Sequence, residues 1–81
     1  MATVHIPSTL RELSGGVAEV EIEAATVRRL IAALEERFPG MGERLRDGTS
    51  VSINGEIMPD ALYEDIPDGA EVHFLPTLAG G

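Results

Sequence analysis

The C-terminal end of the sequence, Gly80 and Gly81, carries its clearest potential for chemistry. Glycine has no Cβ, so a backbone that ends in two glycines passes through channels too narrow for other residues. Such an end lets the active site of another protein reach the terminal carboxyl group and convert it into an activated acyl group. The alternative is a frayed end, because termini are usually disordered unless other contacts hold them. The other residues must decide between these interpretations.

Length and composition exclude several kinds of self-sufficient chemistry. We expect the 81 residues to form a single domain, 1–81, whose small core leaves no room for a deep substrate pocket. We therefore expect no catalytic residues in the chain and no permanently bound cofactor. The absence of cysteine excludes disulfides, thiolate metal sites and a cysteine nucleophile. No stretch is apolar for long enough to span a membrane, and we expect a cytoplasmic protein.

The charge of the chain favours a protein partner over nucleic acid. Fourteen acidic residues against six arginines give a net charge of −8. Nucleic-acid binding needs a basic surface, so this composition disfavours it. An acidic surface instead favours a basic protein partner that approaches faster through electrostatic steering, although it also serves ordinary solubility.

One amphipathic helix is the most secure element in the sequence. Apolar residues recur at helical spacing from Val27 to Phe38, behind Thr26, whose hydroxyl suits an N-cap. Pro39-Gly40 ends the helix, and residues 41–45 predict a further short helical turn. Charged residues of the helix, including Glu35 and Glu36, are expected on its wet side as a solubility feature.

Alternating apolar and polar residues predict the strands of one sheet. Asn54-Gly55 is the typical type I′ turn of a tight hairpin, because both of its central positions need positive φ. Another hairpin is predicted around Ser14-Gly15-Gly16. The predicted strands are residues 3–6, 18–23, 51–53, 56–58 and 71–75.

The order of these elements predicts an α+β fold. A hairpin, a helix, a short hairpin and a last strand give a mixed sheet with one main helix packed on one face, with the last strand beside the first at the centre. This is the β-grasp, or ubiquitin-like, fold. We expect residues 76–81 to leave the sheet as an extended tail about 20 Å long, which is enough to enter the active site of a neighbouring protein.

The face of the sheet that the helix leaves uncovered is a candidate partner surface. His5 and His73 should lie there on adjacent strands, with Leu75 and Ser52 nearby. The sequence offers no obvious third ligand beside the two histidines, so we predict no metal site. Plain solvent exposure is the alternative interpretation.

Several segments resemble the MoaD/ThiS family of ubiquitin-like sulfur carriers, whose member MoaD is the small subunit of molybdopterin synthase. Residues 10–13, Leu-Arg-Glu-Leu, with Gly15 are similar to the family's first loop. Residues 68–72 with Phe74 and Pro76 are similar to its last strand, and residues 79–81 to its tail. Together with the helix start at residues 26–27, the resemblance covers essentially the whole chain.

The resemblance implies a defined chemistry at the tail. A ubiquitin-activating-type adenylating enzyme uses ATP to convert the Gly81 carboxylate into an acyl-adenylate. A sulfur donor, a persulfide sulfurtransferase, then replaces AMP and leaves a C-terminal thiocarboxylate, while Gly80 provides clearance. A sulfur-accepting synthase large subunit takes the sulfur. The resemblance also implies that Arg11 contacts a partner, and we expect the same of Pro76 and Leu78.

The resemblance leaves the pathway open. The first loop and last strand favour molybdopterin (molybdenum cofactor) synthesis, towards which we lean slightly. Ile6-Pro7-Ser8 and Phe38-Pro39-Gly40 are similar to carriers that feed a cysteine synthase, and a thiazole (thiamine) carrier is a third option. A ubiquitin-like protein modifier and a non-covalent interaction module are the alternatives from other functional classes.

Overall fold

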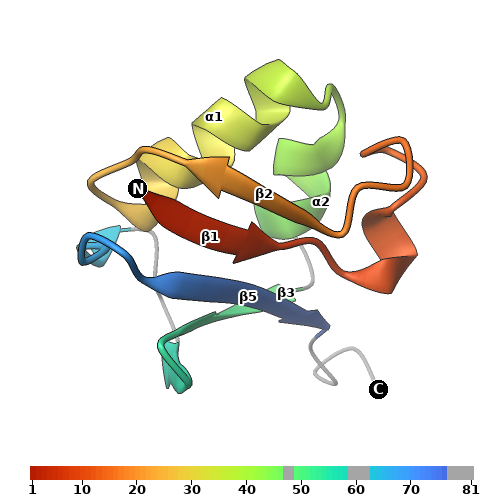
Figure 1. Cartoon of the computed structure of the whole chain (residues 1–81). Helices are drawn as coiled ribbons and strands as arrows, with labels where there is room; N and C mark the ends of the chain where they lie inside the picture. The colour runs from red at the N-terminus through yellow and green to blue at the C-terminus, as the bar shows by residue number, and fades with distance from the viewer. Residues whose placement is uncertain (47–48, 59–62, 77–81) are drawn as a thin grey trace.

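A computed structural model describes residues 1–46, 49–58 and 63–76 of the chain (Figure 1). Its elements follow the predicted order, with boundaries that move by one or two residues. In chain order they are β1 (Ala2–His5), η1 (Ser8–Leu10), β2 (Glu19–Ile22), α1 (Val27–Arg37), α2 (Met41–Arg46), β3 (Thr49–Ile53), β4 (Glu56–Met58) and β5 (Glu71–Pro76).

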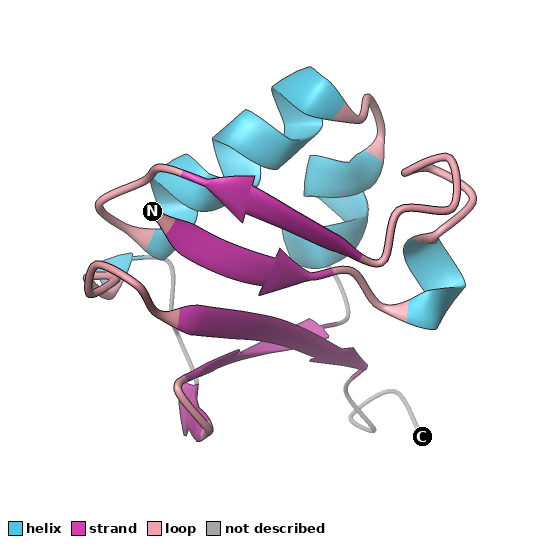
Figure 2. Ribbon diagram, viewed as in Figure 1, coloured by secondary structure: helices cyan, strands magenta, loops and turns pink. Residues whose placement is uncertain are grey.

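The described strands form one mixed sheet in the order β2-β1-β5-β3-β4. The last strand, β5, lies at the centre, parallel to β1 and antiparallel to β3. Both helices, α1 and α2, lie over one side of the sheet (Figure 2). The predicted ubiquitin-like β-grasp fold is therefore confirmed, including the pairing of the first and last strands.

Helix α1 begins and buries its apolar side as its sequence predicts. The Thr26 hydroxyl accepts a hydrogen bond from the Arg29 amide at 3.3 Å, which satisfies a donor that the first helical turn leaves unpaired. Its inward side chains are almost fully buried against the sheet; they are those of Val27, Leu30, Ile31 and Leu34.

Glu35 has a structural role that the sequence analysis missed when it assigned this residue to solubility. Its carboxylate accepts hydrogen bonds from the amides of Gly40 and Gly42, both at 2.9 Å. The contacts tie the end of α1 to the start of α2. They also lower the pKa of Glu35, with the Gly40 amide as the largest cause and the Gly42 amide as the next. A Cβ on Gly42 would lie 2.9 Å from the Glu35 Cβ, so this close approach requires glycine.

The β3–β4 hairpin has the turn that its sequence predicts. Asn54 and Gly55 both have positive φ, 50° and 85°. Asn54 also joins this hairpin to the start of β5, because its amide donates to the Glu71 carbonyl and its side-chain oxygen accepts from the Glu71 amide, each at 2.9 Å. The turn residue thus helps to place the central strand.

The core lies between the sheet and the helices. Val4 and Val72, on the paired central strands, are fully buried there, and Met41 and Leu45 of α2 close one end. Within the described ranges, no helix combines the length and the apolar character that crossing a membrane requires.

Candidate functional site

The candidate site is the uncovered face of the sheet near the C-terminal end of β5. Strand β5 pairs with β1 as far as His73 on one side and with β3 as far as the Thr49–Pro76 pair on the other, so β3 alone holds its last residues. Pro76, which the sequence analysis counted in the tail, belongs to β5. The predicted tail residues Leu78, Gly80 and Gly81 lie outside the described residues.

Two predicted partner residues, His5 and His73, lie directly against each other. They are register partners on β1 and β5, which places both rings on the same face. The rings stack with centroids 4.0 Å apart and an angle of 2° between their planes. The stack is a flat aromatic surface, with polar ring nitrogens, at the middle of the sheet.

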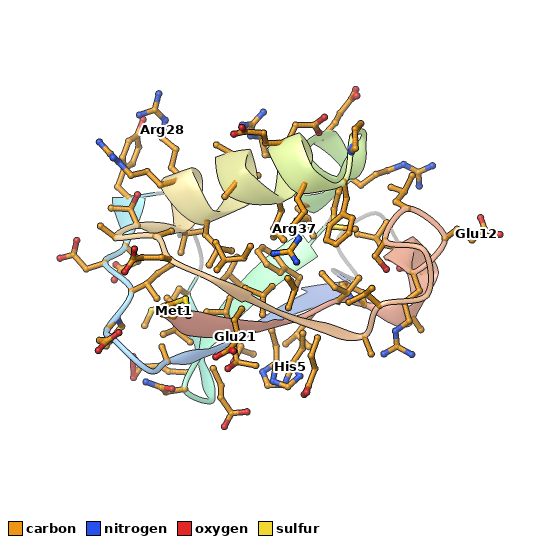
Figure 3. All side chains as sticks on the ribbon, turned by 45° about the horizontal axis from the view of Figure 1, so that its top comes forward. Met1, His5, Glu12, Glu21, Arg28 and Arg37 are labelled. Atoms are coloured by element: carbon orange, nitrogen blue, oxygen red, sulfur yellow. The ribbon has the colours of Figure 1, made fainter. Side chains whose placement is uncertain are left out.

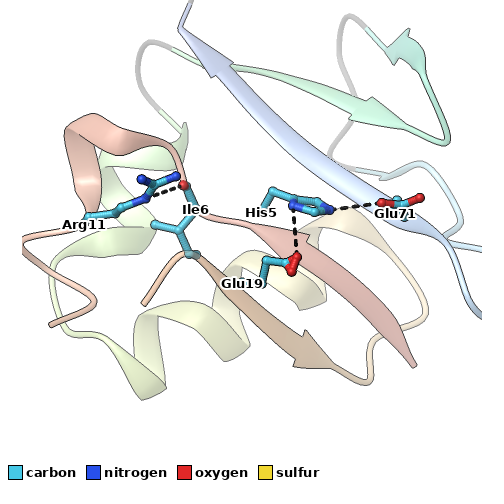
Figure 4. A network of polar contacts seen from close by, with 5 residues as sticks. All are labelled: His5, Ile6, Arg11, Glu19 and Glu71. Atoms are coloured by element: carbon cyan, nitrogen blue, oxygen red, sulfur yellow. Dashed lines mark hydrogen bonds and ion pairs between the residues drawn. The ribbon is translucent and has the colours of Figure 1, made fainter. Parts of the chain in front are cut away.

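Carboxylates flank His5 on both sides of its ring (Figure 4). Its Nε2 lies 3.2 Å from a Glu71 carboxylate oxygen, and its Nδ1 lies 3.8 Å from one of Glu19. These contacts hold the ring in the orientation that stacks on His73. In the residues that the structure describes, no group of three or more His, Cys, Asp or Glu side chains is arranged to hold a metal ion.

Strand register extends this surface across the whole sheet. One row of partners crosses the five strands and consists of Ile57, Ser52, His73, His5 and Glu19. Ile57 is 59% exposed and was missed, although the Asn54-Gly55 turn sets its register against Ser52. Ser52 itself is only 6% exposed, so its predicted place on an accessible surface is wrong. On the uncovered face, Ile57 is instead the accessible side chain of this part of the row, and it is apolar.

Arg11 and Leu75 meet the histidine pair in a shallow hollow of about 350 Å³ at the end of β5. The hollow is formed where η1 and the loop after β1 approach β5. Arg11 is held there because its Nε donates a hydrogen bond to the Ile6 carbonyl at 3.3 Å (Figure 4). Leu75 is 38% exposed and supplies an apolar wall. The structure thus brings together Arg11, His5, His73 and Leu75, four of the residues predicted to contact a partner.

This arrangement is suited to recognition. It offers a cationic guanidinium, stacked imidazoles, two carboxylates and exposed apolar side chains on one open surface. A rigid sheet presents them, and interface cores are enriched in aromatic residues and arginine. The hollow adjoins the last described residues before the predicted reactive tail.

Comparisons with known proteins identify the family. The sequence model described as "ThiS family" matches residues 4–81. The sulfur carrier protein CysO of Mycobacterium tuberculosis (strain H37Rv) is 34% identical over 98% of this chain and 97% of its own length. A molybdopterin synthase sulfur carrier subunit of Pyrenophora tritici-repentis is 32% identical over 67% of this chain and 61% of its own length.

A solved structure agrees with these matches. In the crystal structure of the BexX/CysO complex of Amycolatopsis orientalis, the matching chain superimposes with a TM-score of 0.88 at 34% identity and full coverage of both chains. The similarity extends over the sheet, the helices and the loops that form the candidate site. The chain therefore belongs to the ThiS family.

Proposed function

We propose that this chain is a sulfur carrier protein whose sulfur is held at the carboxyl carbon of Gly81. The observation that carries the proposal is the family match, which extends through residue 81 and so includes the glycine pair. Relatives with matching length are described as sulfur carrier proteins. The protein is then a cosubstrate of other enzymes, has no catalytic residues or permanent cofactor of its own, and works in the cytoplasm.

The proposed chemistry has three balanced steps. In the first, an adenylating enzyme brings the Gly81 carboxylate to the α-phosphorus of ATP, so that an acyl-adenylate forms and pyrophosphate leaves. In the second, a sulfur nucleophile from a persulfide donor attacks the Gly81 carbonyl carbon and AMP leaves with one carboxylate oxygen. This attack leaves an acyl disulfide between Gly81 and the donor. In the third step, a thiol reduces that disulfide, which frees the thiocarboxylate and leaves the donor in a disulfide with the thiol. Gly80 provides the clearance that the first two steps need.

We infer that the adenylating enzyme docks on the uncovered face of the sheet. The supporting observation is the row from Glu19 to Ile57, which places stacked histidines on the two central strands and an apolar side chain on β4, all on one face. The guanidinium of Arg11, at the hollow, is suited to a carboxylate of that partner, and Pro76 and Leu78 are suited to line the path of the tail. Docking there would aim residues 77–81 at the partner's active site.

We propose that this chain is a carrier of the CysO type and that a cysteine-forming synthase accepts its sulfur. Similarity to CysO covers almost the whole of both chains, whereas the molybdopterin synthase subunit matches over a shorter region of each. The slight lean towards molybdopterin in the sequence analysis is therefore not confirmed. Molybdopterin synthesis remains the second candidate, because that subunit also reaches 32% identity.

Intact mass spectrometry tests the carrier function. The purified chain is incubated with its adenylating enzyme, ATP and a persulfide donor, alongside a variant with one alanine appended after Gly81. We expect the wild-type mass to rise by the exchange of one oxygen for sulfur, while the extended variant stays unchanged. A ladder of covalent adducts on other proteins would indicate a modifier instead, and an unchanged wild-type mass would indicate a non-covalent module.

A second experiment decides the acceptor. The thiocarboxylated chain is mixed separately with a cysteine-forming synthase and with a molybdopterin synthase large subunit from the same source, each supplied with its own sulfur-accepting substrate. We expect loss of the thiocarboxylate only with the cysteine-forming synthase. Loss only with the molybdopterin synthase subunit would assign the carrier to molybdopterin synthesis instead.

A further inference from the structure

The edge strand β2 turns unpaired backbone groups towards solvent. The Ile6 amide donates to the Ala18 carbonyl at 2.8 Å, and the Thr3 amide donates to the Ala70 carbonyl at 2.9 Å. The backbone amides and carbonyls of even-numbered β1 residues therefore form hydrogen bonds with β2, and those of odd-numbered residues form them with β5.

The strand register then identifies which groups of β2 are free. Val4 pairs with Val20 and Thr3 with Glu21, so Val20 makes the ladder bonds to β1 and the amides and carbonyls of Glu19 and Glu21 face away from the sheet. No backbone bond is recorded for those edge groups within the described part of the chain. They form a template for one more strand.

A hollow of about 640 Å³ lies along this edge. Glu19, Val20 and Glu21 line it from the strand, and Arg37 and Phe38 line it from the end of α1. Figure 3 shows Arg37 between α1 and β2, and Glu21 on the opposite side of the strand. An incoming strand would therefore have room beside β2 and would meet different chemistry on its two faces.

The two faces define the sequence that would fit. Glu19 and Glu21 are two residues apart, so their side chains project on the same face of β2, the uncovered one, and both residues are exposed. On the helix side, Val20 and the half-buried Phe38 supply an apolar wall, and the Arg37 guanidinium lies 5.9 Å from the Phe38 ring centroid. Alternate side chains of a strand face opposite ways, so a matching segment alternates basic and apolar residues.

We propose that the β2 edge binds an extended, basic segment of a partner protein as an additional strand. The segment has the pattern basic–apolar–basic, with its basic side chains beside Glu19 and Glu21 and its apolar side chain against Val20 and Phe38. A second copy of this chain does not fit, because two β2 edges would bring their own glutamate rows together. This inference goes beyond the proposed carrier function and does not depend on Gly81.

The probe is an end-capped eight-residue peptide of alternating lysine and valine, added to the full-length chain labelled with nitrogen-15. We expect the amide signals of Glu19 and Glu21 to shift and their hydrogen exchange to slow. The control peptide has the same ends and charge, with proline at its central valine positions, and should leave exchange unchanged. Equal effects of both peptides, or shifts centred on β4 or on His73, would overturn the proposal.

Variants separate backbone pairing from general charge attraction. Glu21→Pro removes the outward donor at an edge position that tolerates proline, and we expect loss of detectable binding with the other amide signals retained. Glu21→Gln keeps the donor and should weaken binding by about two- to fivefold, the range of one cross-strand ion pair. Glu36→Gln, an equal charge change on α1, should leave the affinity unchanged.

The outcomes decide the proposal even if Glu21→Pro fails to fold. Equal weakening by Glu21→Gln and Glu36→Gln would show attraction to net charge alone and would overturn it. Shifts at β2 that depend on protein concentration without any peptide would assign the edge to a second copy and would also overturn it.

Discussion

At the scale of single residues, the His5–His73 stack lies where the row of the uncovered face crosses the paired central strands. His73 is half-buried, and its ring covers that of His5, which Glu19 and Glu71 contact on either side. A residue in this position contributes shape and a flat aromatic surface, which are typical properties of binding hot spots.

The substitution His73→Glu tests this surface. It removes the stack and adds a negative charge beside Glu71, so we expect kcat/KM for thiocarboxylation to fall about tenfold. The matched control is Ala32→Glu, which adds the same charge at an exposed position of α1. If both variants react at the wild-type rate, the adenylating enzyme does not dock on this face.

Glu35 predicts a dependence of stability on pH. Its pKa is lowered in the folded chain, first by the Gly40 amide and then by the Gly42 amide. The carboxylate therefore stabilises the fold at pH values above its unfolded pKa, about 4.3, and this contribution is lost as pH falls through the lower folded pKa. Glu35→Gln lacks this titration, so the wild-type advantage should be greatest at neutral pH and should shrink in acid.

Urea unfolding from neutral pH down to about pH 3 measures this effect. Glu36→Gln, at the exposed neighbouring position, serves as the control and should follow the wild-type curve. A wild-type advantage over Glu35→Gln that is constant across the whole range would contradict the assigned role of the carboxylate.

At the scale of elements, the β3–β4 hairpin and β5 are linked through Asn54. Asn54→Gly keeps the positive φ but loses the side-chain acceptor for the Glu71 amide, which should cost about 0.5–1.5 kcal/mol of unfolding free energy. Asn54→Ala loses the acceptor and also strains the backbone, at a further cost of about 1 kcal/mol. Equilibrium denaturation should rank the wild type first, Asn54→Gly second and Asn54→Ala last, and equal stabilities would refute the link.

The elements also show how far the sequence predicts this structure. Local sequence signals were enough to predict α1 and the Asn54-Gly55 hairpin, because caps, periodicity and turn conformation depend on residues close together in the chain. The sequence analysis also placed His5 next to His73, since both follow from alternation once the central strands pair. It missed the role of Glu35, whose partners Gly40 and Gly42 come within reach only when the chain turns back after α1.

The position of Ser52 shows the same limit. Alternation assigns it to the uncovered face, but only 6% of it is exposed, and no pattern along the chain reports that burial. The contacts of Arg11 and the hollow at the end of β5 also depend on how η1 packs beside the sheet. The location of the site was thus predictable, whereas its shape was not.

At the scale of the whole molecule, two surfaces have proposed tasks, the uncovered face and the β2 edge, and Glu19 belongs to both. The helices cover one face of the sheet, the histidine row lies on the other, and β2 offers a free edge. The central strand β5 connects the fold to the tail: β1 pairs with it as far as His73, and β3 pairs with it as far as Pro76. In the proposed function, this small domain presents the Gly81 carboxylate to larger enzymes.

The central claim is that the Gly81 carbonyl carbon is the atom that is activated and then receives sulfur. Its most direct test uses the chain with oxygen-18 in the Gly81 carboxylate, incubated with the adenylating enzyme, ATP and a persulfide donor. We predict that the released AMP carries one labelled oxygen and that the chain keeps the other beside its new sulfur. Unlabelled AMP, with both labelled oxygens still on the chain, would contradict it.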